Sequence, residues 1–220
     1  MSIQPYYERD GITIFHGDCR EILPQLAFDA IVTDAPYGIG FDTDYTRFTG
    51  GVTAATGSHA AVFGDDEPFD PAWLIARCKN VVMFGANCFS ALLPLGSWLV
   101  WDKRTPGGNK NVMSDGEVAW WGRGHGIYIF SHTWDGFNRA SERQTAFHPT
   151  QKPVALLRWV LNRCTGEDDV IADPYMGAGS TVIAARDLGR RAIGIEIEEK
   201  YVEIAARRLE QQVLPIGDIA

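Results

Sequence analysis

Short apolar runs alternate with amphipathic patterns along most of the chain. The apolar runs predict β-strands at residues 11–15, 29–33, 80–84, 97–101, 117–121, 126–130, 168–172 and 191–195. The segments between them predict helices at 19–26, 71–78, 86–93, 153–164, 179–188 and 198–213, the last with apolar residues near a 3.6-residue period. Because strands that alternate with helices form βαβ units, we expect a mostly parallel sheet with helices on both faces, the doubly wound α/β fold class.

Three segments interrupt this alternation. The strands expected at 117–121 and 126–130 are joined through Gly-Arg-Gly-His, which predicts an antiparallel hairpin at one edge of the sheet. The stretch 38–67 is rich in Gly, Thr and Asp, and the stretch 102–116 contains Pro-Gly-Gly-Asn, so we expect both to be long loops. Loops of this length in a compact domain often carry function.

The composition is that of a globular protein. Its 220 residues, 45% of them hydrophobic, can form one large domain or two small ones. The four cysteines are scattered, without a Cys-x-x-Cys motif or a cluster with His, so we expect reduced intracellular thiols and neither a disulfide framework nor a metal site. The start of the sequence lacks a signal-peptide pattern, and no apolar run approaches the roughly 18 residues that a membrane span needs. We therefore expect a soluble, cytoplasmic protein.

The charge distribution singles out the middle of the chain. The net charge is −8 at pH 7, yet residues 101–152 carry 7 Lys and Arg against 5 Asp and Glu and are net basic. The same segment holds four of the seven tryptophans and three of the five histidines, a mixture that suits phosphates and stacked bases. The alternative is a local excess of basic residues beside tryptophans that pack in the core.

One arrangement occurs twice: an acidic start, an apolar strand, and then Asp, Pro and Tyr at the carboxyl end of the strand. The two copies are DAIVTDAPYG at 29–38 and DDVIADPYMGAGST at 168–181. In open α/β sheets, ligands bind outside the carboxyl ends of the strands, where the strand order reverses. We therefore expect the two strand ends to lie side by side and to form one site.

The second copy has the features of a nucleotide-binding turn. Gly177 and Gly179 let the backbone approach a ligand closely, and the free N–H groups at the start of the following helix favour an anion. Glu196 ends the next strand, 19 residues after Gly177, where a carboxylate can accept hydrogen bonds from ribose hydroxyls. The alternative is a tight strand-to-helix turn that needs small residues only for its geometry.

The first copy can hold a planar ring that carries an amino group. Pro36 pushes Ala35 into the extended region of backbone space, which fixes the direction of the Ala35 carbonyl. The Asp34 carboxylate and this carbonyl can accept both N–H bonds of an exocyclic amine, while Tyr37 stacks on the planar ring. The alternative is an ordinary strand-to-loop turn.

Four further segments accompany the two strand ends: GDC at 17–19, FGAN at 84–87, WLVWDK at 98–103 and HPTQKP at 148–153. Together with Asp34-Ala35-Pro36-Tyr37 and with DPYMGAGST at 173–181, they resemble the motifs of the DNA amino-methyltransferases, which methylate adenine N6 or cytosine N4. The tetrapeptide resembles the family's Asp-Pro-Pro-Tyr signature, and the second segment resembles its Asp-Pro-Phe-x-Gly-x-Gly-Thr-Thr cofactor loop. The catalytic motif comes first, as in the permuted members of the family.

The expected topology agrees with the permuted order. No further strand is predicted after the one that ends at Glu196, so the strand at 11–15 has to complete the cofactor half of the sheet. The resemblance implies one S-adenosylmethionine-dependent methyltransferase domain over 1–220, with Asp18 and Cys19 at the adenine and Glu196 at the ribose. It places the methionine pocket at Asp173, Tyr175, Gly177, Gly179, Ser180 and Thr181, with Thr150 and Lys152 near the methionine carboxylate.

Ala35 departs from the family pattern, which usually has a proline at this position. The backbone carbonyl remains, but one ring that stiffens the turn is absent. An acid at the first position occurs in adenine and in cytosine enzymes, with adenine the commoner, so we expect adenine N6 and keep cytosine N4 as the alternative. The base would rotate out of the duplex into the pocket before the transfer.

We expect the segments 38–67 and 102–147 to contact double-stranded DNA and to read a short target sequence. The candidate basic residues are Arg47, Lys103, Arg104, Lys110, Arg123, Arg139 and Arg143. Affinity should then fall with salt, as it does for phosphate contacts. Because the protein is acidic overall, a second subunit in a homodimer would help to cover the duplex.

Other functions stay open at this point. A nicotinamide-dependent oxidoreductase would use the same glycines and Glu196, but it leaves the turn at Asp34 unexplained. A methyltransferase acting on RNA or on a protein amide could use a similar turn. A non-catalytic DNA-binding protein could keep the pocket and have lost turnover through Ala35.

Overall fold

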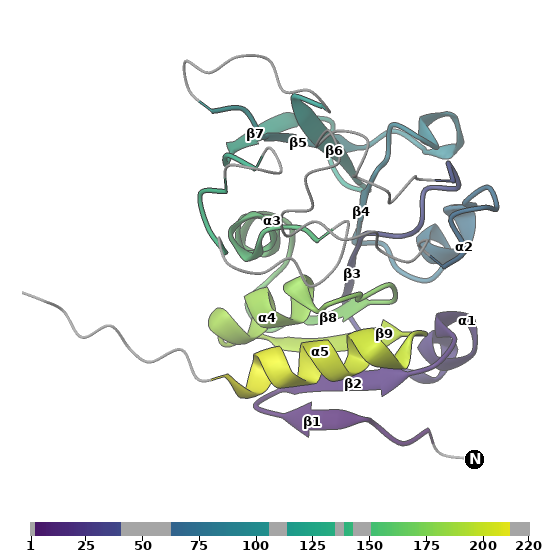
Figure 1. Cartoon of the computed structure of the whole chain (residues 1–220). Helices are drawn as coiled ribbons and strands as arrows, with labels where there is room; N and C mark the ends of the chain where they lie inside the picture. Colours follow the sequence, from purple (N-terminus) through teal and green to yellow (C-terminus); the bar gives the residue numbers. More distant parts are fainter. Residues whose placement is uncertain (1–2, 41–62, 106–113, 135–138, 143–150, 212–220) are drawn as a thin grey trace, which may run out of the picture.

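The computed structural model describes residues 3–40, 63–105, 114–134, 139–142 and 151–211, and Figure 1 shows how its elements are arranged. Strands in this part of the chain form one sheet. In chain order they are β1 (Tyr7–Arg9), β2 (Ile12–His16), β3 (Ala30–Thr33), β4 (Val81–Phe84), β5 (Ser97–Asp102), β6 (Gly116–Trp121), β7 (Ile127–Ser131), β8 (Val170–Asp173) and β9 (Arg191–Glu196). Their order across the sheet is β1-β2-β9-β8-β3-β4-β6-β5-β7.

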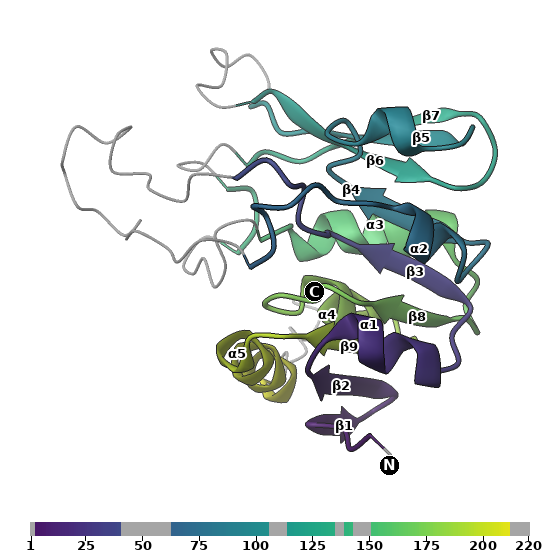
Figure 2. The ribbon, with the colours of Figure 1, turned by 90° about the vertical axis from the view of Figure 1, so that its right-hand side faces the viewer.

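Helices cover both faces of this sheet. They are α1 (Cys19–Ile22), α2 (Ala72–Ile75), α3 (Val154–Cys164), α4 (Ser180–Asp187) and α5 (Glu199–Glu210), with short 3₁₀ helices η1 (Leu23–Gln25) and η3 (Ser90–Leu92). Figures 1 and 2 show α1 and α2 on one face and α3, α4 and α5 on the other. Among the described helices, none has the length and apolar character that crossing a membrane requires.

Each face has its own hydrophobic core because side chains alternate along the strands. Val32 of β3 belongs to the core under α3, α4 and α5, together with Leu156. Its neighbour Ile31 belongs to the core under α1 and α2, together with Leu74. β3 is buried along its whole length, as expected for a central strand with both faces covered.

Most neighbouring strands are parallel, which confirms the predicted α/β class. β2, β9, β8, β3 and β4 run in one direction. β6 is antiparallel to both β4 and β5, and β7 is parallel to β5. The carboxyl ends of β3, β4, β5, β7 and β8 therefore lie at the same edge of the sheet.

β6 and β7, the strands predicted to form a hairpin, do not pair with each other, so that prediction was wrong. β5 lies between them. Their connection crosses the start of β5, where the Ser97 hydroxyl donates to the Arg123 carbonyl at 2.6 Å and accepts the Gly126 N–H at 3.1 Å. The antiparallel hairpin is instead β1–β2 at the opposite edge, joined by Asp10 and Gly11 at positive φ.

The helices on the α1 and α2 face are shorter than predicted. The segment 19–26 divides into α1 and η1, with Pro24 at the start of η1. The α-helix in 71–78 is limited to Ala72–Ile75, and 86–93 holds η3 and no α-helix. Residues 87–90 read NCFS, and all four are weak helix formers. On the other face α5 ends at Glu210, and the predicted residues 212–213 lie outside the described residues.

β2 lies beside β9, as predicted. It lies parallel to β9, in register from Ile12 with Ala192 to His16 with Glu196. The Gly17 N–H donates to the Glu196 carbonyl at 2.9 Å. The carboxyl ends of β2 and β9 therefore lie next to each other.

Candidate active site

The carboxyl ends of β3 and β8 also lie side by side. The two strands are parallel neighbours, with Ile31 paired to Ala172. The Thr33 hydroxyl donates a hydrogen bond to Oδ1 of Asp173 at 2.7 Å, and both side chains are buried. Because Asp34 follows Thr33 directly, the fold brings the two Asp-containing turns together, as expected from the strand pattern.

Hydrogen bonds hold both oxygens of the Asp34 carboxylate. Oδ1 accepts the Tyr37 hydroxyl and Oδ2 accepts the Lys152 ammonium, each at 2.6 Å. Ala35 and Pro36 form the turn between Asp34 and Tyr37, and Ala35 is buried. Burial raises the pKa of Asp34, although the Lys152 charge opposes this. Burial and the Asp34 charge raise the pKa of Tyr37 well above its usual value, so the hydroxyl stays a donor.

Asp65 holds the same turn from a segment outside the strands. Its Oδ1 accepts the backbone N–H groups of Tyr37 at 2.8 Å and Gly38 at 2.9 Å. Its carbonyl oxygen accepts the Gly40 N–H at 2.7 Å. Hydrogen bonds to an ionised carboxylate are stronger than neutral ones, so Asp65 restrains the turn in which Ala35 replaces the usual proline.

The Tyr37 ring lies against the backbone of Gly85, which follows β4. A Cβ atom on Gly85 would lie 1.9 Å from Cε1 of Tyr37, far inside van der Waals contact. Gly85 also has a φ of +66°, a conformation that side chains disfavour. The FGAN segment therefore supports the ring through a residue that cannot carry a side chain.

Four charged side chains form a cluster beside the turn. Lys152 Nζ lies 2.6 Å from Oδ2 of Asp34 and 3.2 Å from Oε2 of Glu117, and Glu117 also pairs with Lys103. Burial opposes the charge on Lys152, but Asp34 and Glu117 raise its pKa well above the usual value. Burial also opposes the charge on Glu117, yet Lys152 and Lys103 hold its pKa below the usual value. Two ammonium groups thus balance two carboxylates.

The Asp34 carboxylate and the glycine-rich turn after β8 face one cavity. Its empty space is about 430 Å³, including the open mouth, which is within the range of small-molecule pockets. The lining residues are Asp34, Phe84, Gln151, Lys152, Leu157, Asp173, Tyr175, Met176, Gly177, Ala178, Ser180 and Thr181. The turn at 34–37, the predicted catalytic turn, and most of the predicted methionine pocket therefore share one space.

The turn between β8 and α4 needs glycine at two positions. Gly177 and Gly179 have φ values of +53° and +84°. A Cβ atom on Gly179 would also lie 2.8 Å from Cβ of Ala205 on α5. Glu196 braces the turn, because its Oε2 accepts the Gly177 N–H at 2.8 Å. Each carboxylate oxygen has a second lone pair, so Glu196 can still accept a ligand hydroxyl.

Asp18 and Cys19 lie at the end of β2, beside the end of β9. Oδ1 of Asp18 accepts the Arg20 N–H at 2.8 Å and caps α1. Cys19 is buried in the same core as Tyr175, and burial raises the pKa of its thiol to about 11. The predicted adenine and ribose residues therefore lie along one edge, next to the cavity.

Three basic residues lie at the same end of the sheet as the predicted catalytic turn. Lys103 and Arg104 follow β5, and Arg139 forms a bridge with Trp134 after β7. Lys103 binds Glu117, whereas Arg104 pairs with Asp102 and keeps 58% of its side chain exposed. The Arg139 guanidinium lies 4.5 Å from the Trp134 ring centroid.

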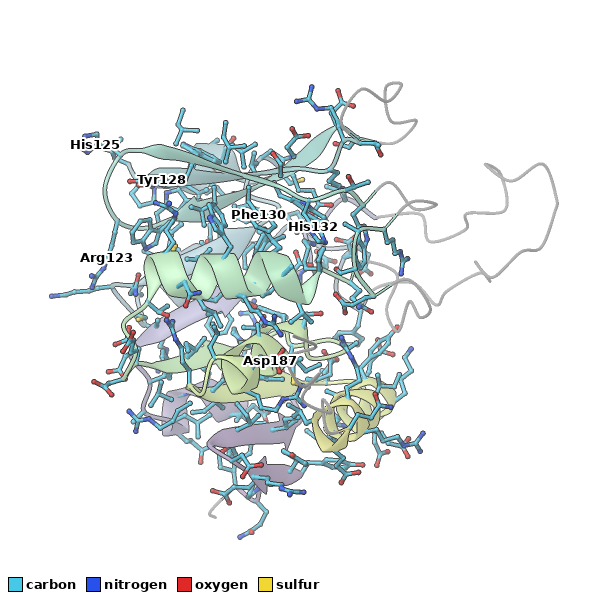
Figure 3. The ribbon with its side chains drawn as sticks, turned by 90° about the vertical axis from the view of Figure 1, so that its left-hand side faces the viewer. Arg123, His125, Tyr128, Phe130, His132 and Asp187 are labelled. Atoms are coloured by element: carbon cyan, nitrogen blue, oxygen red, sulfur yellow. The ribbon has the colours of Figure 1, made fainter. Side chains whose placement is uncertain are left out.

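Arg123 lies at the other end of the strands, away from the carboxyl ends of β3, β5 and β8. It follows β6, and the preceding Gly122 donates its N–H to the carbonyl of Val81 at the start of β4. Figure 3 shows Arg123 and His132 at opposite ends of α3. The structure thus separates Arg123 from the site, contrary to its grouping with the other basic residues. Four further predicted site residues, Arg47, Lys110, Arg143 and Thr150, lie outside the described residues.

Sequence reasoning assigned no role to Asp65, Glu117 or Gly85. Asp65 lies in the segment predicted as a long loop, where nothing marks one acid among several. Glu117 is the first residue of a predicted strand, and its contact with Lys152 depends on how distant segments pack. Gly85 belongs to the FGAN segment, and a glycine directly after an apolar strand was the available signal.

Comparison with known proteins identifies the class. The sequence matches the N6_N4_Mtase family, described as DNA methylase, over residues 28–207. The match spans most of the chain, so the protein belongs to this family and is an S-adenosylmethionine-dependent DNA methyltransferase.

Individual relatives agree in sequence and in fold. The type II methyltransferase M.ScaI of Streptomyces caespitosus is 28% identical, over 95% of this chain and 84% of its own. The cytosine-N4-specific PvuII DNA methyltransferase has the same fold at 16% identity, with a TM-score of 0.61 over 97% of this chain and 91% of that one. The M1.HpyAVI–SAM complex matches at 23% identity, with a TM-score of 0.58 over 90% of this chain and 98% of that one.

The cavity residues fit S-adenosylmethionine, which joins a cationic amino acid to a nucleoside. Asp173 supplies a buried carboxylate at the cavity for a cationic group, and Gly177 leaves the turn without a side chain. Glu196 adds an acceptor at the end of β9 for hydroxyl groups. The described residues thus offer a carboxylate for a cationic group and an acceptor for hydroxyl groups, which fits both parts of the cofactor.

Proposed function

We propose that this enzyme methylates the exocyclic amino group of a base in double-stranded DNA, with adenine N6 as the target. The observation that carries the proposal is that the Asp34 carboxylate faces the same cavity as the turn after Asp173. An acceptor for the amine and a pocket for the methyl donor thereby adjoin. Asp as the first residue of the tetrapeptide is the form that the resemblance associates more often with adenine.

The target base has to leave the duplex before it reacts, because its amino group is otherwise paired and stacked. Extrusion costs on the order of a few kcal/mol. Tyr37 receives the base: Gly85 supports the ring on one side, and the base stacks on the other. The bond from the Tyr37 hydroxyl to Asp34 keeps the ring and the carboxylate in a fixed relation.

Asp34 and the Ala35 carbonyl accept the two amine protons in hydrogen bonds, which concentrates the lone pair on the nitrogen. When bound, S-adenosylmethionine supplies an electrophilic methyl group on a sulfonium, so that a C–N bond forms as the C–S bond breaks. The product nitrogen is cationic and gives one proton to Asp34, whose pKa is raised by burial. The base leaves as a neutral secondary amine.

We assign the cofactor contacts as the resemblance implies, with one change. Asp18 and Cys19 hold the adenine and Glu196 the ribose, and the methionine part lies against Asp173, Tyr175, Gly177, Gly179, Ser180 and Thr181, with Thr150 near its carboxylate. Because Lys152 is bonded to Asp34 in the structure, we assign it to the catalytic carboxylate rather than to the cofactor.

The duplex approaches the edge at which β3, β5 and β7 end. Parts of the segments 38–67 and 102–147 contact the DNA there, with Arg104 and Arg139 as the proposed contacts among the described residues and Arg47, Lys110 and Arg143 as further candidates. Lys103 acts mainly through Glu117, to which it is bonded. We leave Arg123 out because it lies at the opposite edge.

Nucleoside analysis tests the proposal. The protein is incubated with unmethylated duplex DNA and isotopically labelled S-adenosylmethionine, and the digested DNA is analysed by mass spectrometry. We expect labelled N6-methyldeoxyadenosine. Labelled N4-methyldeoxycytidine alone would move the target to cytosine, and label in RNA or protein with none in DNA would overturn the assignment.

A further inference from the structure

Glu117 of β6 lies beside the catalytic turn, and one of its carboxylate oxygens accepts no hydrogen bond from the described residues. Its Oε1 accepts a hydrogen bond from Lys103, which orients the side chain. Its Oε2 is buried and accepts no hydrogen bond from any described residue. Lys152 Nζ lies 3.2 Å from this oxygen, close enough for an ion pair but without the alignment of a hydrogen bond.

Lys152 occupies the carboxylate that the proposed reaction needs. Its ammonium lies 2.6 Å from Oδ2 of Asp34, while the Tyr37 hydroxyl takes Oδ1. An incoming amine competes with the Lys152 ammonium for the negative charge of the same carboxylate, which weakens the bond from Lys152 to Asp34. A buried ammonium group that loses its counter-charge is strongly destabilised. A second carboxylate within reach removes this obstacle.

We propose that Glu117 is a positioning residue, which accepts the Lys152 ammonium when the amino group of the target base engages Asp34. The inference rests on the proposed role of Asp34 as the amine acceptor. Without DNA, Lys152 is bonded to Asp34. With the base in place, it is bonded to Oε2 of Glu117, and Asp34 is available to the amine. The net charge of the cluster does not change.

The surroundings of Lys152 suit a short displacement of its ammonium. The group lies 5.6 Å from the Phe84 ring centroid and 5.8 Å from that of Tyr37, and aromatic faces stabilise a cation between its two partners. The titratable and charged groups that surround it are Asp34, Tyr37, Lys103, Glu117 and, at the end of β8, Asp173. The charges of Lys152 and Lys103 hold the pKa of Glu117 below its usual value against burial, so its carboxylate can accept the ammonium.

Glu117→Gln tests the proposal, because the amide keeps the size of the side chain and loses its charge. We expect kcat for DNA methylation to fall by about tenfold or more, with KM for DNA changed by less than about threefold. The acid limb of the pH profile, where kcat falls as Asp34 takes up a proton, should move to lower pH. The reason is that the Glu117 charge, which this variant lacks, raises the pKa of Asp34. Lys152→Met should move it to higher pH, because the ammonium lowers that pKa.

Glu117→Asp separates charge from reach. The shorter side chain keeps the charge, so the acid limb should stay at its wild-type position while kcat falls. This variant also carries the test if Glu117→Gln does not fold. Asp187→Asn is the matched control, because Asp187 is a partly buried acid paired with Arg158 and Arg186 on the α3 and α4 side (Figure 3). It should keep the wild-type kcat and acid limb.

Two results would overturn the inference. One is a wild-type kcat with an unmoved acid limb in Glu117→Gln. The other is a fall in kcat that follows a loss of thermal stability and leaves the acid limb in place, as a structural role predicts. If the wild-type enzyme itself transferred no methyl group to DNA, the proposed function would fail and the inference with it. The wild-type assay therefore separates the two failures.

Discussion

The Thr33 hydroxyl donates a hydrogen bond to Oδ1 of Asp173 at 2.7 Å. This bond joins the carboxyl ends of β3 and β8, from which the proposed catalytic turn and the glycine-rich turn continue. Both groups are buried, so the bond is not in competition with water. Strand pairing therefore sets the relative position of the two turns, and Asp65 restrains the first turn further.

Folding should become less favourable as the pH rises through the titration of Asp173. Burial raises the pKa of Asp173 to about 6, although hydrogen bonds from Thr181 and Thr33 oppose this. In the unfolded chain an aspartate loses its proton near pH 4, before it does so in the folded protein. The contribution of Asp173 to the free energy of unfolding is therefore fully present below about pH 4 and is lost as the pH rises through about 6. The loss is roughly 3 kcal/mol.

Asp173→Asn should remove this dependence, because the amide does not ionise. Urea unfolding of the cofactor-free protein at several pH values from about 4 to 7 measures it. The free energy of unfolding of the variant should gain roughly 3 kcal/mol relative to wild type across this range. The exposed Asp168→Asn should show no such trend. A constant difference between Asp173→Asn and wild type would show that burial does not perturb this carboxylate.

Removal of the Asp65 carboxylate should loosen the catalytic turn. Asp65→Ala leaves the N–H groups of Tyr37 and Gly38 without their acceptor, and each such loss costs about 1–3 kcal/mol. We expect kcat to fall by about ten- to a hundredfold. The Kd for S-adenosylmethionine should stay within about threefold of wild type, because the turn after β8 is untouched.

Asp66→Ala is the control for this change, because Asp66 is the exposed neighbour of Asp65. It should match wild type in steady-state kinetics and in cofactor binding by calorimetry. Cofactor affinity that falls as far as kcat in Asp65→Ala would mean that Asp65 supports the whole site rather than the turn.

Gly85→Ala should displace the Tyr37 ring. The added methyl group would lie 1.9 Å from Cε1 of Tyr37. Gly189→Ala is the matched control, because Gly189 has the same φ of +66° and nothing within 4 Å of the added atom. Both variants should lose about 1 kcal/mol of stability from the positive φ. Methylation should fall at least about tenfold in Gly85→Ala alone, and equal activity of the two would contradict a role of the ring.

Arg104 and Arg123 form a matched pair for DNA binding. Both are exposed, but Arg104 lies at the edge of the catalytic turn and Arg123 at the opposite edge. Arg104→Ala should weaken binding to a duplex and reduce the slope of log K against log salt by about one. Arg123→Ala should change neither. Fluorescence anisotropy over a series of salt concentrations measures both, and equal effects would refute the proposed approach of the duplex.

The features that the sequence predicted well depend on the geometry of a parallel sheet. Carboxyl ends of parallel strands meet at one end of the sheet, so the Asp-Ala-Pro-Tyr and Asp-Pro-Tyr turns after two strands indicated a shared site. The predicted cofactor half needed one more strand after the one that ends at Glu196. This indicated that β2 lies beside β9, and the structure confirms this pairing.

The features that could not be predicted from the sequence depend on contacts between distant segments. The bond from Asp65 to Tyr37 spans 28 residues, and no local pattern indicates it. The turn residues suggested a hairpin of β6 and β7, whereas β5 lies between these two strands. Glu117 reaches Lys152 only because β6 packs beside β4.

The most direct measurement is single-turnover transfer of a labelled methyl group from S-adenosylmethionine to duplex DNA by wild type and by Asp34→Ala. Asp34→Asn is measured beside them, because its amide keeps one acceptor oxygen next to Lys152. We predict that the rate falls by at least about a hundredfold in Asp34→Ala, with cofactor affinity within about threefold of wild type. A rate in Asp34→Ala equal to that of wild type would show that Asp34 does not act on the amine.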